Sequence, residues 1–367
     1  MSTTHERNPT DGWRTGLLGG LASGTFSTAV VSLGARRIGR DPQLDWMEAA
    51  TVALRDRAIH TQPGWGEVVA GVLVHQSADL AWALVFFGLG ARWSRRLRPP
   101  ALLALSAPWA LITSAIEYYL ILPWLQPILP MQVPYWTALT VHLASGTVYP
   151  LYPWIRERAS GQEQTDKTFV RCWAAVLAGG LGLLAGLTAL VRAGYGPPWP
   201  FAAKQAREYD RTFLHHMTAH HQIGERLATM AVEKGIRHEF CVLNELILAE
   251  HQAEIDLMCD WWRRWYKEEM PTITAKEYME IAGMPAPAAI KELETLEGLD
   301  FEEHYLPIMI FHHEGAITMA NNAWEQAGDP RLRILADSIR HSQRGQIERM
   351  AALFRKGVTL RAEASRS

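Results

Sequence analysis

Two matching stretches decide the fold of this chain: DRTFLHHMTAHHQIG at residues 210–224 and EEHYLPIMIFHHEGA at residues 302–316. The second repeats the first at an offset of 92 residues, and both contain the pattern M-x-x-H-H. The same offset continues downstream, where Ile247, Glu254, Ile255, Met258 and Trp262 correspond to Ile339, Gln346, Ile347, Met350 and Phe354. Self-similarity at a fixed spacing indicates a duplicated structural unit. We therefore expect the C-terminal part of the chain to contain one unit twice.

Each copy has the periodicity of a helical hairpin. Asp210, Leu214, Met217 and His221 fall on one helical stripe of the first copy, and the second copy repeats that stripe. Glycine and proline at residues 234–235 and 328–330 predict a turn within each copy. Two antiparallel helix pairs make a four-helix bundle. The predicted units are a first hairpin at 203–267, a connecting segment at 268–299, a second hairpin at 300–358 and a tail at 359–367.

Five nearly uncharged stretches precede the bundle, at residues 15–35, 68–91, 101–122, 134–154 and 172–191. Each is long enough to cross a bilayer as a helix. They predict a five-span transmembrane domain over residues 1–193, followed by a linker at 194–202. The predicted fold class is therefore all-α, with a multi-pass helical membrane domain followed by the four-helix bundle.

The placement of arginine predicts the orientation of these spans. Segment 92–98 contains four arginines, whereas segment 125–133 carries no charge. Because cytoplasmic loops are enriched in basic residues, we expect the N-terminus inside and the bundle outside. This is the topology of a bacterial cytoplasmic (inner) membrane protein with a periplasmic or extracellular C-terminal domain. Segment 36–57 would face outward although it contains five arginines. Its four acidic residues and its amphipathic pattern offset this positive charge.

The interior stripe of the bundle carries side chains that suit a metal ion. Met217, His220 and His221 stand at i, i+3 and i+4, so a thioether and two imidazoles share one helical face. Polar groups buried without partners would be costly, so these residues need a ligand or one another. The predicted metal ligands are Met217, His220, His221, His251, Glu254, Met258, Met309, His312, His313 and Met350, with Asp210, Glu302 and Met319 as additional candidates.

The ligand chemistry favours copper without excluding other metals. Imidazole with thioether suits copper, particularly Cu(I), whereas carboxylate with imidazole suits iron, manganese or zinc. The near balance of 36 basic and 38 acidic residues gives no sign of nucleic-acid binding. The expected partners are metal ions and the lipid bilayer, with a homodimer or other metal-homeostasis proteins as further candidates.

Four ionisable side chains lie inside predicted spans: His75, Asp79, Glu117 and His142. Such groups are costly in a membrane and are often functional. One interpretation is a proton or metal relay. The other is a polar cluster that only fixes the packing of the helices.

The sequence also resembles a known family. The carrying motifs are D-x-x-F-L-x-x-M-x-x-H-H from Asp210 and M-x-x-H-H-E-G-A-I-T-M-A from Met309, each followed by a Q/E-I-x-x-M segment. They resemble the ferritin-like family called domain of unknown function 305, over about residues 209–356. The resemblance implies an exported or membrane-attached bacterial protein, with copper binding and resistance in some members. It implies a binding role for Met217, His220, His221, Met258, Met309, His312, His313 and Met350.

This chain departs from the family pattern in both copies. The first copy has Gly224 and Leu227 where the family usually has Ala and Met. The second copy has Gln343 and Gln346 where His251 and Glu254 would be matched. We therefore expect two unequal half-sites, the second binding more weakly.

Three functions compete. The leading hypothesis is an outward-facing protein of copper homeostasis, which binds the metal for buffering, delivery or detoxification and needs no enzymatic turnover. The alternative is a di-metal iron or manganese oxidoreductase. Such a site requires a carboxylate from each of two helices and a Glu-x-x-His motif from each of the other two helices. Gln343 and Gln346 argue against it, although Asp210, Glu254 and Glu302 keep it open. The third is a metal or proton carrier that uses the membrane half.

Overall fold

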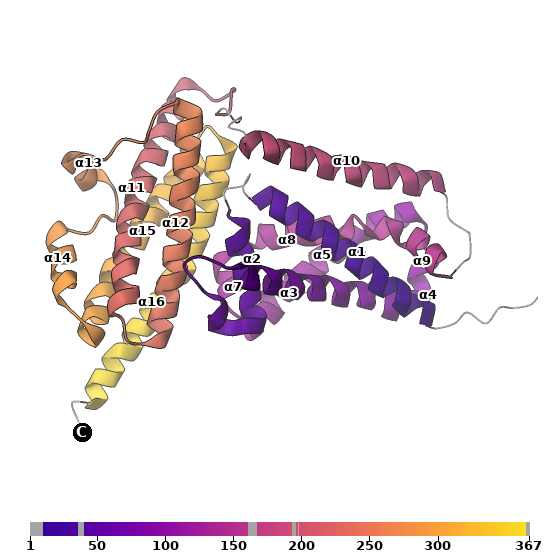
Figure 1. Ribbon diagram of the computed structural model, residues 1–367, viewed down its shortest axis with the longest axis horizontal. Coiled ribbons are helices and arrows are strands. Elements are labelled where there is room, and N and C mark those ends of the chain that lie inside the picture. Colours follow the sequence, from indigo (N-terminus) through magenta and orange to yellow (C-terminus); the bar gives the residue numbers. More distant parts are fainter. Residues whose placement is uncertain (1–9, 36–39, 161–166, 193–195, 197, 365–367) are drawn as a thin grey trace, which may run out of the picture.

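The computed structural model describes residues 10–35, 40–160, 167–192, 196 and 198–364. Regular structure in these residues consists of helices, with no strand among them, so the all-α prediction is confirmed. Figure 1 shows two parts, a group of helices from the N-terminal half and a bundle of longer helices whose axes run across it.

The N-terminal half contains long apolar helices joined by short ones. Its elements are α1 (Thr10–Gly34), α2 (Pro42–Leu54), η2 (Arg55–Ala58), α3 (Trp65–Ala83), η3 (Leu84–Leu89), α4 (Ala91–Ser94), α5 (Pro99–Ile116), η4 (Glu117–Ile121), α6 (Leu122–Leu125), α7 (Ile128–Gln132), α8 (Tyr135–Gly146), η5 (Tyr149–Leu151), α9 (Tyr152–Ser160) and α10 (Lys167–Arg192). Within the part of the chain that the structure describes, four helical segments are long and apolar enough to cross a membrane, at Gly12–Gly34, Trp65–Leu89, Pro99–Leu125 and Lys167–Val191.

The fourth of the five predicted spans, residues 134–154, is not one helix. The chain leaves helix α8 after Gly146, makes a turn and continues through the short η5 before α9 begins. Pro150 explains the break, because its ring would clash with the carbonyl four residues earlier and it offers no N–H. Helix α8 alone has 12 residues, too few to cross a bilayer. The prediction of five continuous membrane helices is therefore wrong at this segment.

The C-terminal half is built from two helix pairs. Its elements are α11 (Lys204–Lys234), α12 (His238–Tyr266), α13 (Ala275–Glu280), α14 (Pro287–Thr295), α15 (Gly298–Gln326) and α16 (Pro330–Ala364). Helix α11 packs along α12, α15 along α16, and α11 against α15. The short helices α13 and α14 lie on the side of the bundle remote from the N-terminal helices (Figure 1).

A reciprocal pair of carboxylates ties the two helix pairs together. Asp210 on α11 accepts hydrogen bonds from the backbone N–H groups of Gly328 and Asp329, at 2.8 and 3.0 Å, in the turn between α15 and α16. Glu302, the matching residue on α15, accepts from the N–H groups of Ile236 and Arg237, both at 2.8 Å, in the turn between α11 and α12. Each copy therefore caps the turn of the other.

The two halves meet where α2 and α7 pack beside the bundle helices. Helix α7 contacts α16, and Leu44, Met47 and Ile128 share a hydrophobic cluster with Val242 and Leu246 of α12. Figure 1 shows α2 and α7 at the bundle end of the N-terminal half and α4 and α9 at the opposite end. The arginine-rich segment 92–98 thus lies at the end remote from the bundle.

Candidate metal centre

Five histidines form a layer in the middle of the bundle: His220, His221, His251, His312 and His313. All are buried, with at most 2% of any of them exposed. Helices α11 and α15 each contribute a pair, and α12 contributes His251. The layer lies between two hydrophobic clusters, one around Phe240 and Tyr305 and the other around Trp262 and Leu332.

Most ring nitrogens in this layer have no hydrogen-bond partner. The unpartnered atoms are both nitrogens of His220 and of His251, Nδ1 of His221 and of His313, and Nε2 of His312. A buried polar atom without a partner costs about 1–3 kcal/mol. A group of such atoms in a protein interior therefore points to an occupant that satisfies them.

Three of the rings are oriented by hydrogen bonds to their other nitrogen. His221 Nε2 lies 2.7 Å from Glu254 Oε2, and His313 Nε2 lies 2.7 Å from Gln346 Oε1, the matching contact in the second copy. His312 Nδ1 donates to the carbonyl of Gly283 at 2.9 Å. In each ring the partnered nitrogen carries the proton and the other nitrogen keeps its lone pair, as in metal-ligating histidines.

The unpartnered nitrogens are close together but do not all surround one position. The rings of His220 and His312 stack face to face at 3.7 Å, and those of His221 and His251 lie 4.5 Å apart between centroids. Among the described residues, no three of these histidines place donor atoms all within 4.8 Å of one another. Binding one ion through three rings therefore requires some imidazoles to rotate.

Gly224 makes room for this layer. A Cβ at that position would lie 2.4 Å from His251 Cε1 and 3.0 Å from His312 Nε2, so a side chain would displace both rings. The second copy has Ala316 at the matching place, and His251 is matched there by Gln343. Glycine at position 224 of the first copy thus leaves the space that the additional imidazole, that of His251, occupies.

The four methionines flank the histidine layer instead of lying within it. Met217 and Met258 are fully buried in the cluster around Trp262, and Met309 and Met350 are fully buried in the cluster around Phe240. Each copy therefore places one thioether pair in one of the two clusters that enclose the layer. Met319 is only partly buried and packs against the cluster of the first pair.

The two acidic candidates Asp210 and Glu302 have a structural role. Their oxygens accept the backbone N–H groups of the hairpin turns, and Glu302 also pairs with Arg237. The sequence placed them on the interior stripe, whereas in the structure both carboxylates bind the backbone of the hairpin turns.

Burial keeps four of the five histidines uncharged. It lowers the pKa of His312 to about 4 and that of His313 to about 3, and neighbouring imidazoles add to the effect. The same two causes hold the pKa values of His220 and His251 well below the usual range. Neutral imidazole is the form that binds metal, so these four rings have the protonation state of a ligand at neutral pH.

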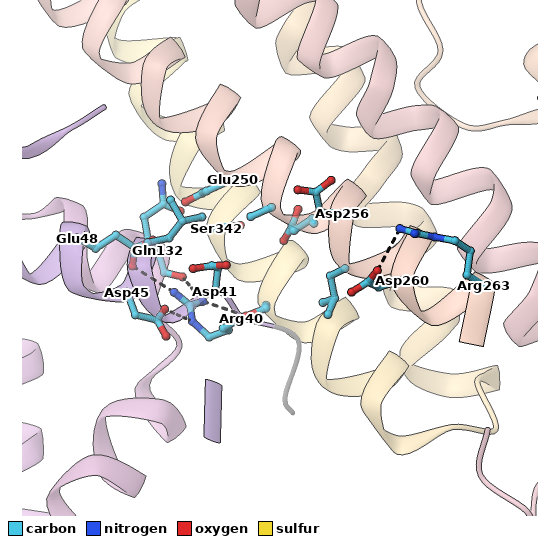
Figure 2. A pocket seen from close by; sticks show the side chains of 15 residues that line it. Arg40, Asp41, Asp45, Glu48, Gln132, Glu250, Asp256, Asp260, Arg263 and Ser342 are labelled. Carbon is cyan, nitrogen blue, oxygen red and sulfur yellow. Dashed lines mark hydrogen bonds and ion pairs between the residues drawn. The ribbon is translucent and has the colours of Figure 1, made fainter. Parts of the chain in front are cut away.

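An acidic cavity of about 420 Å³ lies between the two halves of the protein. Figure 2 shows Arg40 beside Asp45 and Glu48 on one wall, with Glu250 on another. Arg40 donates to Asp45 at 2.6 Å and to Glu48 at 3.1 Å, and burial raises the pKa of Glu48 to about 8. Sequence reasoning missed this cavity, because its walls come from segments that meet only after the halves pack.

The cavity wall is continuous with the histidine layer. Glu254, which lines the cavity, contacts His221, and Glu250 accepts a hydrogen bond of 2.6 Å from Gln346, which in turn contacts His313. One side of the histidine layer is thus separated from the cavity by single side chains. Among the described residues of segment 36–57, Arg40 is neutralised by its ion pairs with Asp45 and Glu48.

The four ionisable residues of the predicted spans form two pairs. His75 Nε2 lies 3.5 Å from Asp79 Oδ2, and Asp79 also accepts from Ser27 and Ser145 at 2.7 and 2.6 Å. His142 Nε2 lies 3.5 Å from Glu117 Oε2, at the residue where the π-helical segment η4 begins. The structure therefore pairs each imidazole with a carboxylate.

Comparison with known proteins identifies the bundle. Residues 210–354 match the family model described as Domain of unknown function (DUF305). The comparison with curated proteins gave no match. Similar solved structures include a putative secreted protein DUF305 from Streptomyces coelicolor, at 26% identity over 41% of this chain and 93% of that chain, with a TM-score of 0.38.

Two further solved structures are similar over the same part. A DUF305 fragment from Deinococcus radiodurans has 25% identity over 44% of this chain and 99% of that chain, with a TM-score of 0.38. CopM in its Cu(I)-bound form has 27% identity over 40% of this chain and 96% of that chain, with a TM-score of 0.34. The family model thus matches the C-terminal bundle, as the motifs indicated, and the membrane-length helices lie outside the matched residues.

Proposed function

We propose that this protein binds a metal ion, copper above others, in the histidine layer of its DUF305 domain. The observation that carries the proposal is the set of seven unpartnered nitrogens on five buried imidazoles. Histidines that served packing alone would be expected to bond to one another or to the backbone. Here they are held with lone pairs available, and a metal ion satisfies several of them at once.

The chemistry of the surroundings favours copper within that proposal. Imidazole accepts several first-row metals, but thioether selects copper, above all Cu(I). Two buried methionine pairs enclose the layer, Met217 with Met258 on one side and Met309 with Met350 on the other. Neutral, desolvated surroundings also suit a singly charged ion better than a doubly charged one.

The di-metal oxidoreductase is less well supported by the geometry. It needs carboxylates at the centre of the bundle, yet Asp210 and Glu302 cap the hairpin turns. Glu254 contacts the layer, but it is matched in the second copy by the neutral Gln346. Metal binding without turnover therefore remains the better proposal.

The test is a titration of the full-length chain in detergent with Cu(I), Zn(II) and Fe(II), with a chromophoric chelator as competitor. The double variant His220→Leu with His312→Leu removes the stacked pair and leaves the oriented rings of His221 and His313. We expect the affinity for Cu(I) to fall by more than the roughly 10–100-fold that loss of an outer partner causes. His304→Ala, at an exposed histidine of α15, is the control.

Unchanged Cu(I) affinity in the double variant, with helix content preserved, would overturn the proposal. A preference for Fe(II) together with oxygen consumption would favour the oxidoreductase. Absence of tight binding in the native chain would make the layer structural.

For the membrane half we propose an inner-membrane location, with the bundle on the side opposite the arginine-rich segment 92–98 and a relay through the two His–carboxylate pairs. The π-helical segment that begins at Glu117 supports the relay, since such segments frequently mark functional positions. Asp79→Ala in proteoliposomes should abolish metal-dependent proton movement. The same flux in the variant would leave the pairs as packing contacts.

A further inference from the structure

A second cluster of metal-binding side chains lies on the outer face of the bundle. His215 and His216 of α11 and Glu277 of α13 each offer one ligand atom, and these atoms all lie within 4.8 Å of one another. All three residues are half-buried. Glu277 lies on α13, and Figure 1 shows α13 on the side of the bundle that faces away from the N-terminal helices.

In two of the three residues, hydrogen bonds occupy one potential ligand atom and leave the other available. His215 Nε2 lies 2.9 Å from the carbonyl of Pro271, so Nε2 carries the proton and Nδ1 keeps its lone pair. Glu277 Oε2 accepts from the N–H and the hydroxyl of Thr274, both at 2.7 Å, which leaves Oε1 toward the histidine. His215 Nδ1 and Glu277 Oε1 are 3.9 Å apart, too far for a hydrogen bond.

That separation fits a shared ion. Donor atoms about 2.0–2.2 Å from a metal can be at most about 4.4 Å apart, so a distance of 3.9 Å lies within the range. The ligand atom of His216 lies within 4.8 Å of the other two, so a small rotation of this half-buried side chain would complete the set. A cavity of about 170 Å³ adjoins His215 and leaves room for water as a further ligand.

We propose that His215, His216 and Glu277 form a second metal site, which takes a divalent ion of borderline softness such as Cu(II) or Zn(II). Two imidazoles and a carboxylate are the ligand set of open zinc and copper(II) sites with a water in the remaining position. This site differs from the buried layer in three ways: it includes a carboxylate, it is accessible to solvent and it is nearly assembled. An open site at the surface suits an ion that exchanges with the surroundings.

Only the first copy carries this site. The residues that match His215 and His216 in the second copy are Pro307 and Ile308, and neither can bind a metal. Position 216 therefore has a natural replacement from within the same chain, His216→Ile. Glu277→Gln is equally specific, because a glutamine oxygen can still accept from Thr274 while its amide replaces the free carboxylate oxygen.

The experiment uses the full-length chain in which His220→Leu and His312→Leu have disabled the buried layer. We expect it to retain one equivalent of Cu(II), with nitrogen hyperfine splitting in its electron paramagnetic resonance spectrum. Adding His215→Ala and His216→Ile should remove that signal and lower the affinity by at least tenfold. Glu277→Gln should weaken binding and change the spectrum, whereas Glu280→Gln on the same short helix should do neither.

Retention of the signal after His215→Ala and His216→Ile would overturn this site. This outcome is distinguishable from failure of the proposal for the buried layer. The surface site is tested with Cu(II) and the variants of His215 and His216, whereas the layer is tested with Cu(I) and the variants of His220 and His312. Loss of Cu(I) binding with Cu(II) binding intact supports two separate sites.

Discussion

The two copies of the hairpin have the same frame and different interiors. Asp210 and Glu302 cap each other's turns in the same way, and His221 and His313 contact Glu254 and Gln346 at the same distance of 2.7 Å. Yet His251 is matched by Gln343, and Gly224 by Ala316. The duplication thus preserves the contacts that hold the bundle together, whereas the residues around the proposed metal centre differ between the copies.

The largest effect that we expect concerns the second copy, where His313 contacts an uncharged amide. Burial lowers the pKa of His312 to about 4 and of His313 to about 3, below the value in the unfolded chain. Their stabilising contribution is therefore complete above about pH 6.5 and is lost as the pH falls toward 4, on the order of several kcal/mol. Thermal unfolding of the metal-free chain between pH 7.5 and 4.5 measures it.

His313→Gln provides the control for that measurement. The variant lacks one of the histidines whose pKa is lowered by burial, so its melting temperature should fall less steeply with decreasing pH. Equal slopes in the two proteins would contradict the assignment.

The next effect concerns the turn of the first copy. Arg237 pairs with the fully buried Glu302 and also donates to the carbonyl of Leu353 at 2.9 Å. Arg237→Leu leaves a buried carboxylate without its cation and should lower the free energy of unfolding by about 3 kcal/mol. Adding Glu302→Gln should restore part of the loss, because no buried charge remains. Chemical denaturation of both variants measures these free energies. A double variant that is no more stable than Arg237→Leu alone would contradict the prediction.

Gly224→Ala tests the space that distinguishes the copies. The added methyl group would meet His251 Cε1 at 2.4 Å, so overpacking should cost roughly 1–3 kcal/mol and weaken metal binding. The reciprocal Ala316→Gly should leave metal binding unchanged and cost about 1 kcal/mol of helix stability. Equal effects of the two substitutions on Cu(I) affinity would mean that Gly224 is not part of the centre.

The smallest effect comes from making the two copies alike. Glu254→Gln keeps a hydrogen-bond acceptor for His221 but removes the charge that raises the basicity of the ring. We expect Cu(I) affinity to fall by about tenfold, at the low end of the range for such partners. Gln346→Glu should raise it. Changes of the same sign in both variants would show that charge is not the difference between the half-sites.

Local sequence patterns predicted the helix pairs and the paired histidines correctly in position. Helical spacing alone places His220 and His221 on the inner face of α11, and the repeat places His312 and His313 on α15. The role of Asp210 and Glu302 was not predictable in this way, because it depends on how one copy docks on the other. The carbonyl of Gly283 that orients His312 comes from a loop with no sequence signal for it.

Two features escaped sequence reasoning for different physical reasons. The acidic cavity needs Arg40 and Glu48 from one half and Glu250 from the other, so only tertiary packing assembles it. The repeat gives no signal for His215 and His216, because the second copy has Pro307 and Ile308 in their place. Their partner Glu277 lies in the segment between the copies, where the repeat carries no information.

X-ray absorption at the copper edge of the full-length chain, loaded with one equivalent of Cu(I), tests the central claim most directly. We predict a first shell dominated by imidazole nitrogen, and its loss in the variant His220→Leu with His312→Leu. A first shell of oxygen alone, or a spectrum unchanged by the two substitutions, would contradict a metal centre in the histidine layer.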